Sequence, residues 1–331
     1  MPKKVIIIIL SILMICGAVF VFRKRSSLNV EPKKDFASIA YNESDLMSRF
    51  VVRFAEREGL FEKNGLDVEI ISKENFVYVP LFSDEVDLVI GPTSLIDFYF
   101  SPSVEMRWIG NLASRYNGYL VSREEYGSVS NIKRVGVSRE RSIDTLKVEM
   151  VLKSMGVEGV EKISELSNDS KSRLLKEGKI DMALIDRPDI VEDLLNSGFY
   201  IWDIKDFHGG INYQAPHLFT IQKNIEKKED EIARLVKSLV EAVELTIEDR
   251  DAAVKVLSRE MGVDIEQADN LYQDYREIFL ERDYIPSLDK IRPTLPFIIS
   301  SDGPRVADRD LTDLIVSVFI KKAINQLGIS K

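Results

Sequence analysis

The chain has 331 residues, of which 45% are hydrophobic and 30% are charged, a composition typical of globular proteins and a length that allows roughly two domains. Its formal net charge of −9 argues against binding to nucleic acid, which needs a basic patch. One cysteine, Cys16, excludes an intrachain disulfide, and two histidines make a histidine- or thiolate-rich metal site unexpected.

The N-terminus carries an apolar run at residues 5–22, interrupted only by Ser11 and Gly17 and flanked by basic residues. A run of about 18 residues can cross a bilayer core, so residues 1–28 are predicted to be a membrane anchor or signal segment. No small-x-small cleavage site follows the run. A cleaved signal peptide and a lipoprotein attached through Cys16 stay open, although Ile15 is larger than the residue that usually precedes a lipidated cysteine.

Two stretches, residues 36–93 and 134–188, share one plan. Each opens with a short apolar run that ends in polar residues and continues with an amphipathic helix pattern that stops at a glycine. Each closes on an acidic residue, Asp87 or Asp181, within an apolar run that ends in proline. Such alternation predicts parallel strands joined by crossover helices, and therefore two α/β lobes of similar build. Ligands of open α/β sheets bind at the carboxyl ends of the strands.

The remaining elements are predicted from periodicity and turn residues. Strands are expected over residues 66–71, 86–90, 107–112, 118–122, 158–163, 181–185 and 200–204, with an extended segment over 213–222. Short helices are expected over residues 46–55, 79–82, 93–100, 146–155, 169–177 and 190–196. From residue 229 the chain is predicted to be mostly helical, at residues 232–243, 252–261, 265–280 and 311–327.

Polar residues after the strands of the first stretch are candidates for ligand binding. Asn42, Ser44 and Asp45 open a helix, and either Ser44 or Asp45 can cap that helix. Thr93 and Ser94 follow the strand that closes the stretch, where they can cap a helix or donate to a ligand.

The second stretch offers a matching set. Ser138, Arg141 and Ser142 lie in a loop that opens a helix, where backbone N–H groups and an arginine could hold a carboxylate, sulfonate or phosphate. An ordinary capped helix with exposed arginines is the alternative. Asp186 holds the place of Thr93, with an Asp186–Arg187 structural pair as the alternative.

Aromatic residues could line such a site, although most buried aromatics are core. The candidates are Trp108, Tyr116, Tyr119, Trp202 and Tyr213. His217, in the extended segment that returns the chain to the first lobe, is expected to be structural. No nucleophile–base pair stands out, and no dinucleotide-binding, phosphate-loop or nucleophile-elbow motif is found, so the residues by themselves indicate no reaction and no cofactor.

Four segments carry a resemblance to a known family: residues 58–69 (EGLFEKNGLDVE), 86–91, 136–138 and 178–185. With them the chain resembles the solute-binding proteins of ABC importers of the nitrate/sulfonate/taurine type, which are similar to thiamine-pyrimidine-precursor synthases. The resemblance spans roughly residues 36–225. Residues 131–134 depart from it, since the family usually has Leu-Lys-Gly-Lys there.

The resemblance implies an α/β, two-lobed periplasmic-binding-protein-like fold (type II), here with an N-terminal transmembrane helix. Lobe 1 would comprise residues 35–121 and 215–331, and lobe 2 residues 122–214, with hinge crossings near residues 120–123 and 212–218. The family's ligand-facing loops match Asn42, Ser44, Asp45, Thr93, Ser94, Ser138, Arg141, Ser142, Asp186 and Tyr213.

The function implied is capture of a small anionic or heterocyclic solute by hinge closure, on the outer side of the cell membrane, and delivery to an ABC permease. The expected protein is a monomer held by its N-terminal helix, with no cofactor and no metal. An enzyme on the same fold, of the thiamine-pyrimidine or menaquinone pathway type, is the alternative, but those enzymes are cytosolic and lack such a segment. A ligand sensor is a further alternative.

Overall fold

The computed structural model describes residues 34–43, 45–73, 77–91, 105–113, 118–123, 125, 131–138, 143–164, 166–203, 216–291 and 312–329. The predicted anchor at residues 1–28 and the predicted helix at residues 93–100 lie outside these ranges. Within the described ranges, no helix combines the length and the apolar character needed to cross a bilayer.

The first sheet has the strand order β2-β1-β3-β10-β4. β1 runs parallel to β3, whereas β10 runs antiparallel to both β3 and β4. The bounds are β1 (Asp35–Asn42), β2 (Leu66–Lys73), β3 (Leu88–Gly91), β4 (Met106–Asn111) and β10 (His217–Ile221). The segment predicted to return the chain to this sheet, residues 213–222, does so as β10.

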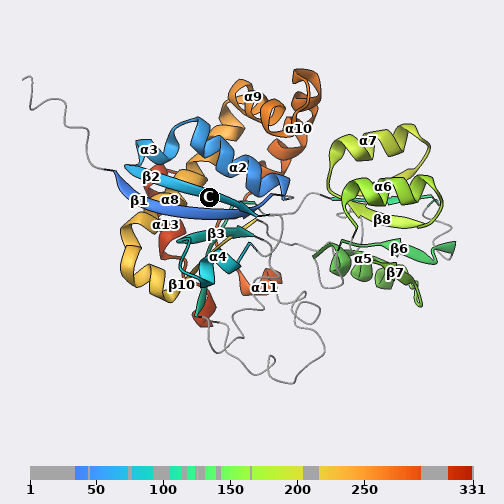
Figure 1. Ribbon diagram of the computed structural model, residues 1–331, viewed down its shortest axis with the longest axis horizontal. Coiled ribbons are helices and arrows are strands. Elements are labelled where there is room, and N and C mark those ends of the chain that lie inside the picture. The colour runs from blue at the N-terminus through green and yellow to red at the C-terminus, as the bar shows by residue number, and fades with distance from the viewer. Residues whose placement is uncertain are drawn as a thin grey trace, which may run out of the picture. The chain divides into compact units, whose positions relative to one another are not determined.

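Alternate residues of the first sheet enter two separate cores, as the two-residue period of a strand requires. Ile39 of β1 packs with the larger helical layer, and its neighbour Ala40 packs on the opposite face. The larger layer contains α2 (Leu46–Arg57), α3 (Leu60–Lys63), α8 (Gln222–Glu248), α9 (Arg250–Met261), α10 (Ile265–Leu280) and α13 (Val318–Leu327). The opposite face is covered by α4 (Val79–Phe82) and α11 (Leu288–Ile291) (Figure 1). The 3-10 turn η4 (Thr312–Leu314) packs there too, through Leu314.

The last predicted helix, residues 311–327, is too long. α13 begins only at Val318, because the preceding chain forms a 3-10 turn and then a bridge beside β4. Ile315 pairs with Trp108, and the Val316 N–H donates to the Trp108 carbonyl at 3.0 Å. This pairing covers the outer edge of β4, and an unpaired edge would be a liability for aggregation.

The second sheet has the strand order β7-β6-β8-β5-β9. β6 runs parallel to β7 and β8, and β5 runs antiparallel to β8 and β9. The bounds are β5 (Tyr119–Ser122), β6 (Arg134–Gly136), β7 (Glu161–Ile163), β8 (Met182–Ile185) and β9 (Tyr200–Asp203). The two-sheet α/β architecture predicted from the repeated plan is thereby confirmed.

Helices cover both faces of the second sheet (Figure 1). Leu184 faces α5 (Ile143–Ser154), whereas its neighbour Ile185 faces α6 (Asn168–Lys176) and α7 (Pro188–Asn196). Both of these strand positions are apolar, which explains why β8 is an unbroken apolar run in the sequence.

The chain leaves the first sheet after Asn111 and enters the second at Tyr119. The crossing was expected near residues 120–123. It lies earlier in the chain, because β5 pairs along its whole length within the second sheet. The return crossing lies between Asp203 and His217, in keeping with the expectation at residues 212–218.

Candidate ligand-binding site

The end of β1 leads directly into a capped helix. Asp45 is the N-cap of α2, and its carboxylate accepts from the Ser48 N–H at 3.2 Å and from the Ser48 hydroxyl at 2.7 Å. Burial raises the pKa of Asp45, while the hydrogen bonds from Ser48 oppose that rise. Asp45 therefore caps the helix as predicted, at the carboxyl end of a parallel strand where the fold binds ligands.

The end of β6 carries Ser138, which receives a hydrogen bond from a buried lysine. The Lys171 ammonium donates to Ser138 Oγ at 2.8 Å and to the Leu184 carbonyl at 2.9 Å. Lys171 lies on α6 and is 1% exposed. Lys171 was not among the predicted site residues; it lies one helical turn before the buried Leu175, on the face of α6 that meets the sheet.

Asp186 follows β8 and makes a different contact from the one expected. Its Oδ1 accepts from the Asn168 side-chain amide at 2.5 Å. Arg187, the alternative partner of Asp186, donates to Asp189, with Nε to Oδ1 at 3.0 Å, and lies 3.6 Å from Asp169. Its hydrogen bond to Asp189 raises the pKa of Arg187, and the charges of Asp169 and Asp186 add to that rise. The first turn of α6 thus brings an amide and, three residues on, an ammonium to the ends of β8 and β6.

The other predicted ligand-binding residues lie outside the described ranges: Ser44, Thr93, Ser94, Arg141, Ser142 and Tyr213. Asn42, Asp45, Ser138 and Asp186 are the predicted site residues that the structure describes, and each lies at the carboxyl end of β1, β6 or β8. Among the described residues, no cluster of histidine, cysteine or carboxylate side chains is suited to a metal ion.

His217 and Trp108 belong to a buried network at the ends of β4 and β10. Asn111 Oδ1 accepts from Trp108 Nε1 at 2.8 Å and contacts His217 Nδ1 at 2.6 Å. Burial lowers the pKa of His217 to about 3, so its imidazole is neutral and donates from Nδ1. The rings of Trp108 and His217 meet edge-on at 4.8 Å between centroids. Both residues are fully buried, which gives Trp108 a core role rather than a place in an exposed aromatic wall.

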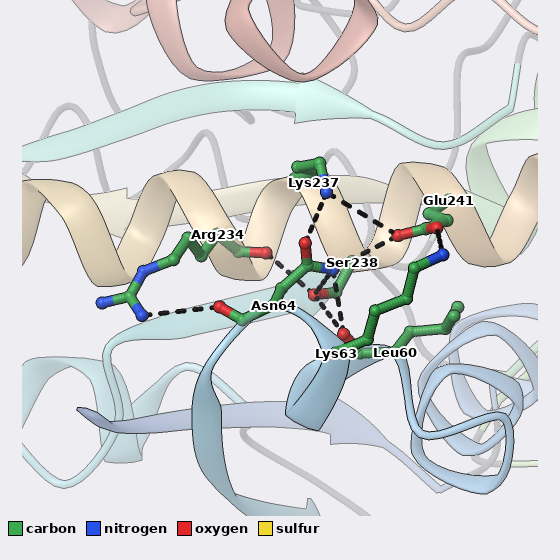
Figure 2. Close-up of polar contacts among 7 residues, drawn as sticks. All are labelled: Leu60, Lys63, Asn64, Arg234, Lys237, Ser238 and Glu241. Carbon is green, nitrogen blue, oxygen red and sulfur yellow. Dashed lines mark hydrogen bonds and ion pairs between the residues drawn. The ribbon is translucent and has the colours of Figure 1, made fainter. Parts of the chain in front are cut away.

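The segment that carries the family resemblance most specifically, residues 58–69, fastens the start of β2 to α8 (Figure 2). The Asn64 side-chain amide donates to the Leu60 carbonyl at 2.9 Å, to Ser238 Oγ at 3.0 Å and to Glu241 Oε2 at 3.2 Å. Asn64 Oδ1 accepts from Lys237. Gly65, at φ 74°, then turns the chain into β2. These residues have a structural role, and they lie away from the strand ends just described.

Comparison with known proteins places the chain in a family. The sequence profile of the family described as "NMT1/THI5 like" matches residues 50–253. A comparison with curated protein sequences finds no match.

Solved structures share the fold at low sequence identity. The chain is similar to the periplasmic aliphatic sulphonate binding protein SsuA from Escherichia coli, at 15% identity and a TM-score of 0.65, with 81% of this chain and 86% of that chain covered. It is similar to the periplasmic nitrate-binding protein NrtA from Synechocystis PCC 6803, at 12% identity and a TM-score of 0.65, with 90% of each chain covered. It is also similar to the desulfurization enzyme DSZB, at 12% identity and a TM-score of 0.60, with 89% of this chain and 100% of that chain covered.

At these identities the structural likeness shows the fold alone. The profile match is the stronger finding for kinship, because it covers more than half of the chain and runs from α2 through both sheets into α9. The suspected family is therefore confirmed, and this chain belongs to the NMT1/THI5-like family.

Proposed function

We propose that this protein is the extracytoplasmic solute-binding component of an ABC importer and that it captures a small anionic or heterocyclic solute without transforming it. The observation that carries the proposal is the set of polar groups at the carboxyl ends of parallel strands in both sheets, on a periplasmic-binding-protein fold. Asp45 lies at such an end in the first sheet, and Ser138 and Asp186 lie at such ends in the second.

Capture would proceed by closure of two lobes built on the two sheets. A solute that contacts both lobes binds the closed state better, and this difference in affinity is what shifts the population toward closure. The lobes are proposed to divide between Asn111 and Tyr119 and again between Asp203 and His217, which moves the first boundary back from the expected residue 121 because β5 pairs in the second sheet. The permease would be the partner of the closed, loaded monomer.

The location follows from residues 5–22, which we propose to be an uncleaved single-pass anchor with the binding domain on the outer side of the membrane. The run is apolar over a length that spans a bilayer core. A tether would keep the receptor close to its permease, which raises the effective concentration of one for the other.

A second candidate function is that of an enzyme on the same fold, and the structural likeness to the desulfurization enzyme DSZB supports it. The apolar run at residues 5–22 favours binding instead, because the enzymes that the family resembles are cytosolic and lack such a segment. A ligand sensor would bind in the same way and differ only in its partner.

The test is a thermal-shift screen of the full-length protein in detergent micelles against a panel of small metabolites, followed by calorimetry. A solute at 100 times its Kd adds about 2.7 kcal/mol to the free energy of unfolding and raises Tm by several degrees. The solute should be recovered unchanged by mass spectrometry after prolonged incubation. A panel without any stabilising solute contradicts solute capture, and a converted solute establishes the enzyme.

A matched pair of variants tests the site. Asp186→Ala removes a carboxylate at the end of β8. Asp193→Ala removes an exposed carboxylate on α7, which pairs with Lys176 of α6. Affinity should change at least tenfold in the first variant, falling for a solute that donates to the carboxylate and rising for a purely anionic one, and should stay within twofold in the second. Equal affinities in the two variants contradict the role of Asp186. Arg141→Ala with Ser142→Ala tests the loop outside the described residues in the same assay.

A further inference from the structure

Lys171 is a buried cation at the ends of two neighbouring parallel strands. Its ammonium lies 2.8 Å from Ser138 Oγ, directly after β6, and 2.9 Å from the carbonyl of Leu184 in β8. The side chain is 1% exposed, whereas Ser138 itself is half-buried. Ser138 is thus the more accessible group, and the lysine charge lies immediately beneath it.

A buried ammonium stabilises the fold less than an apolar side chain of similar size would. Removing a charge from water costs free energy that an apolar residue would not cost, and the next residue on the same face of α6, Leu175, is apolar. α5, on the opposite face of the sheet, also buries a lysine, Lys147, which is 2% exposed. Each of the helices α5 and α6 therefore carries one buried lysine.

The contact with Lys171 orients the Ser138 hydroxyl. An ammonium can only donate, so the Ser138 oxygen accepts from it and the hydroxyl proton points away from Lys171. The positive charge also strengthens that hydroxyl as a donor, because bonded groups polarise one another in a low-dielectric surrounding. A donor backed by a positive charge favours an acceptor that carries negative charge.

We propose that Lys171 is a positioning residue for ligand recognition, which acts through Ser138 to select a solute with a compact oxyanion group. Ser138 donates to an oxygen of that group, and the charge of Lys171 stabilises it from below. This inference rests on the proposed function, and it deepens it by assigning the preference for an anion to a lysine beneath the strand ends.

The experiment compares charged and uncharged probes of one shape on the full-length protein. The probes are methanesulfonate, sulfate, nitrate and acetate, with dimethyl sulfone as the uncharged analogue of methanesulfonate. The wild-type protein should bind at least one of the oxyanions by calorimetry, and should bind methanesulfonate at least tenfold more tightly than dimethyl sulfone. A wild-type protein that binds none of the oxyanions but does bind a neutral solute from the metabolite panel overturns this inference and leaves solute capture intact. A protein that binds nothing overturns both.

The variants separate charge from structure. Lys171→Met keeps the length of the side chain and removes the charge, and it should weaken binding of the oxyanion at least tenfold in a protein that still folds. Lys171→Arg keeps the charge and should stay within threefold of wild type. Lys176→Met, on the exposed side of the same helix, is the control and should leave affinity unchanged.

A double-mutant cycle shows whether Lys171 acts through Ser138. Ser138→Ala should lose about as much affinity as Lys171→Met, and the double variant should lose no more than either single variant. Losses that multiply, or a Lys171→Met protein that binds as wild type, overturn the proposal. If Lys171→Met fails to fold by circular dichroism, Ser138→Ala decides: an equal loss for charged and uncharged probes overturns the proposal, and a loss confined to the oxyanion supports it.

Discussion

Asp87 and Asp181 make the same contact in two different sheets. Asp87 immediately precedes β3 and accepts the Ser38 N–H of β1 at 2.8 Å, and Asp181 immediately precedes β8 and accepts the Arg134 N–H of β6 at 2.8 Å. Each carboxylate ties the start of its strand to the parallel neighbour, at Ser38 within β1 and at Arg134, the first residue of β6. The acidic residue that closes each half of the sequence repeat therefore holds two parallel strands together. It lies at the amino end of its strand, whereas the candidate site lies at the carboxyl ends.

Loss of Asp87 should destabilise the fold strongly. Its carboxylate also accepts from the Ser38 hydroxyl at 3.0 Å and from the Lys228 ammonium at 2.9 Å, and Asp87 is 6% exposed. Asp87→Ala leaves a partly buried lysine and a buried N–H without their acceptor, so the free energy of unfolding should fall by about 3 kcal/mol. Urea titration followed by circular dichroism measures the change.

Asp181 provides the comparison, because its surroundings are more exposed. Burial works against its ionisation, but hydrogen bonds from the Lys133 and Arg134 N–H groups and from the Arg134 guanidinium outweigh burial and lower the pKa of Asp181. Asp181→Ala should cost about 1–2 kcal/mol, less than Asp87→Ala. Asp193→Ala, on the surface, is the control. A larger loss for Asp181→Ala than for Asp87→Ala would contradict this ranking.

His217 should make stability depend on pH. Burial lowers the pKa of His217 to about 3, so below pH ~6.5 the unfolded chain binds a proton that the folded protein does not. The stabilisation is complete above pH ~6.5 and is lost as pH falls toward the folded value. From pH 7 to pH 5 this single group should lower the free energy of unfolding by about 2 kcal/mol.

The check is a comparison with His217→Gln, whose amide can still donate to Asn111 and does not titrate. Urea unfolding of both proteins at pH 7, 6 and 5 cancels the contribution of the carboxylates they share. The difference in unfolding free energy between wild type and variant should shrink by about 2 kcal/mol over that range. A difference that is independent of pH would show that folding does not lower the pKa of His217.

Asn64 should contribute more to the free energy of unfolding than its partial exposure suggests. Its amide joins the carbonyl of Leu60 to Ser238 and Glu241, and its oxygen receives Lys237 (Figure 2). Asn64→Ala breaks these contacts at once, and the expected loss is about 2 kcal/mol. Thermal unfolding measures it, with Glu58→Ala, an exposed residue near the same turn, as the matched control. Equal Tm values for the two variants would refute the role of the Asn64 contacts.

Gly136 in β6 leaves no room for a side chain. A Cβ at this position would lie 2.6 Å from Ile180 Cδ1 and 3.2 Å from Leu166 Cδ1. Gly136→Ala should therefore cost about 1–2 kcal/mol through overpacking. Ile180→Val removes the clashing methyl group, so the double variant should lose less stability than the sum of the two single variants. Urea unfolding measures the three free-energy changes. If the losses of stability simply add, the new methyl group does not clash with Ile180.

Several elements were predictable because local patterns define them. The apolar stripe of α10 and the capping box of Asp264 with Gln267 make residues 265–280 a helix on sequence grounds, and the structure has α10 over the same residues. Asp45 was one of two candidate caps for the first helix and is the one that caps it. The excess length predicted for the last helix has a tertiary cause, since Ile315 pairs with β4 instead of extending α13.

The candidate site was predictable in outline and not in its contacts. Strand ends are visible in the sequence, so Asn42, Asp45, Ser138 and Asp186 could be selected. Lys171 could not, because a lysine in a helical segment is ordinarily solvent-exposed and only packing against the sheet reveals that it is buried. The hydrogen bond from Asn168 to Asp186 was missed for a related reason, because the two residues are 18 positions apart in the sequence and meet only in the folded structure.

The sequence by itself determined the two βαβ units, the helical C-terminal part and the family, because periodicity, capping residues and a short signature are local properties of the chain. Only the tertiary structure decided that β5 pairs in the second sheet, that β10 runs antiparallel between β3 and β4, and that Lys171 lies beneath Ser138. Strand order and burial arise from contacts between residues far apart along the chain, and neither the periodicity of a segment nor its composition records which distant partner will cover it.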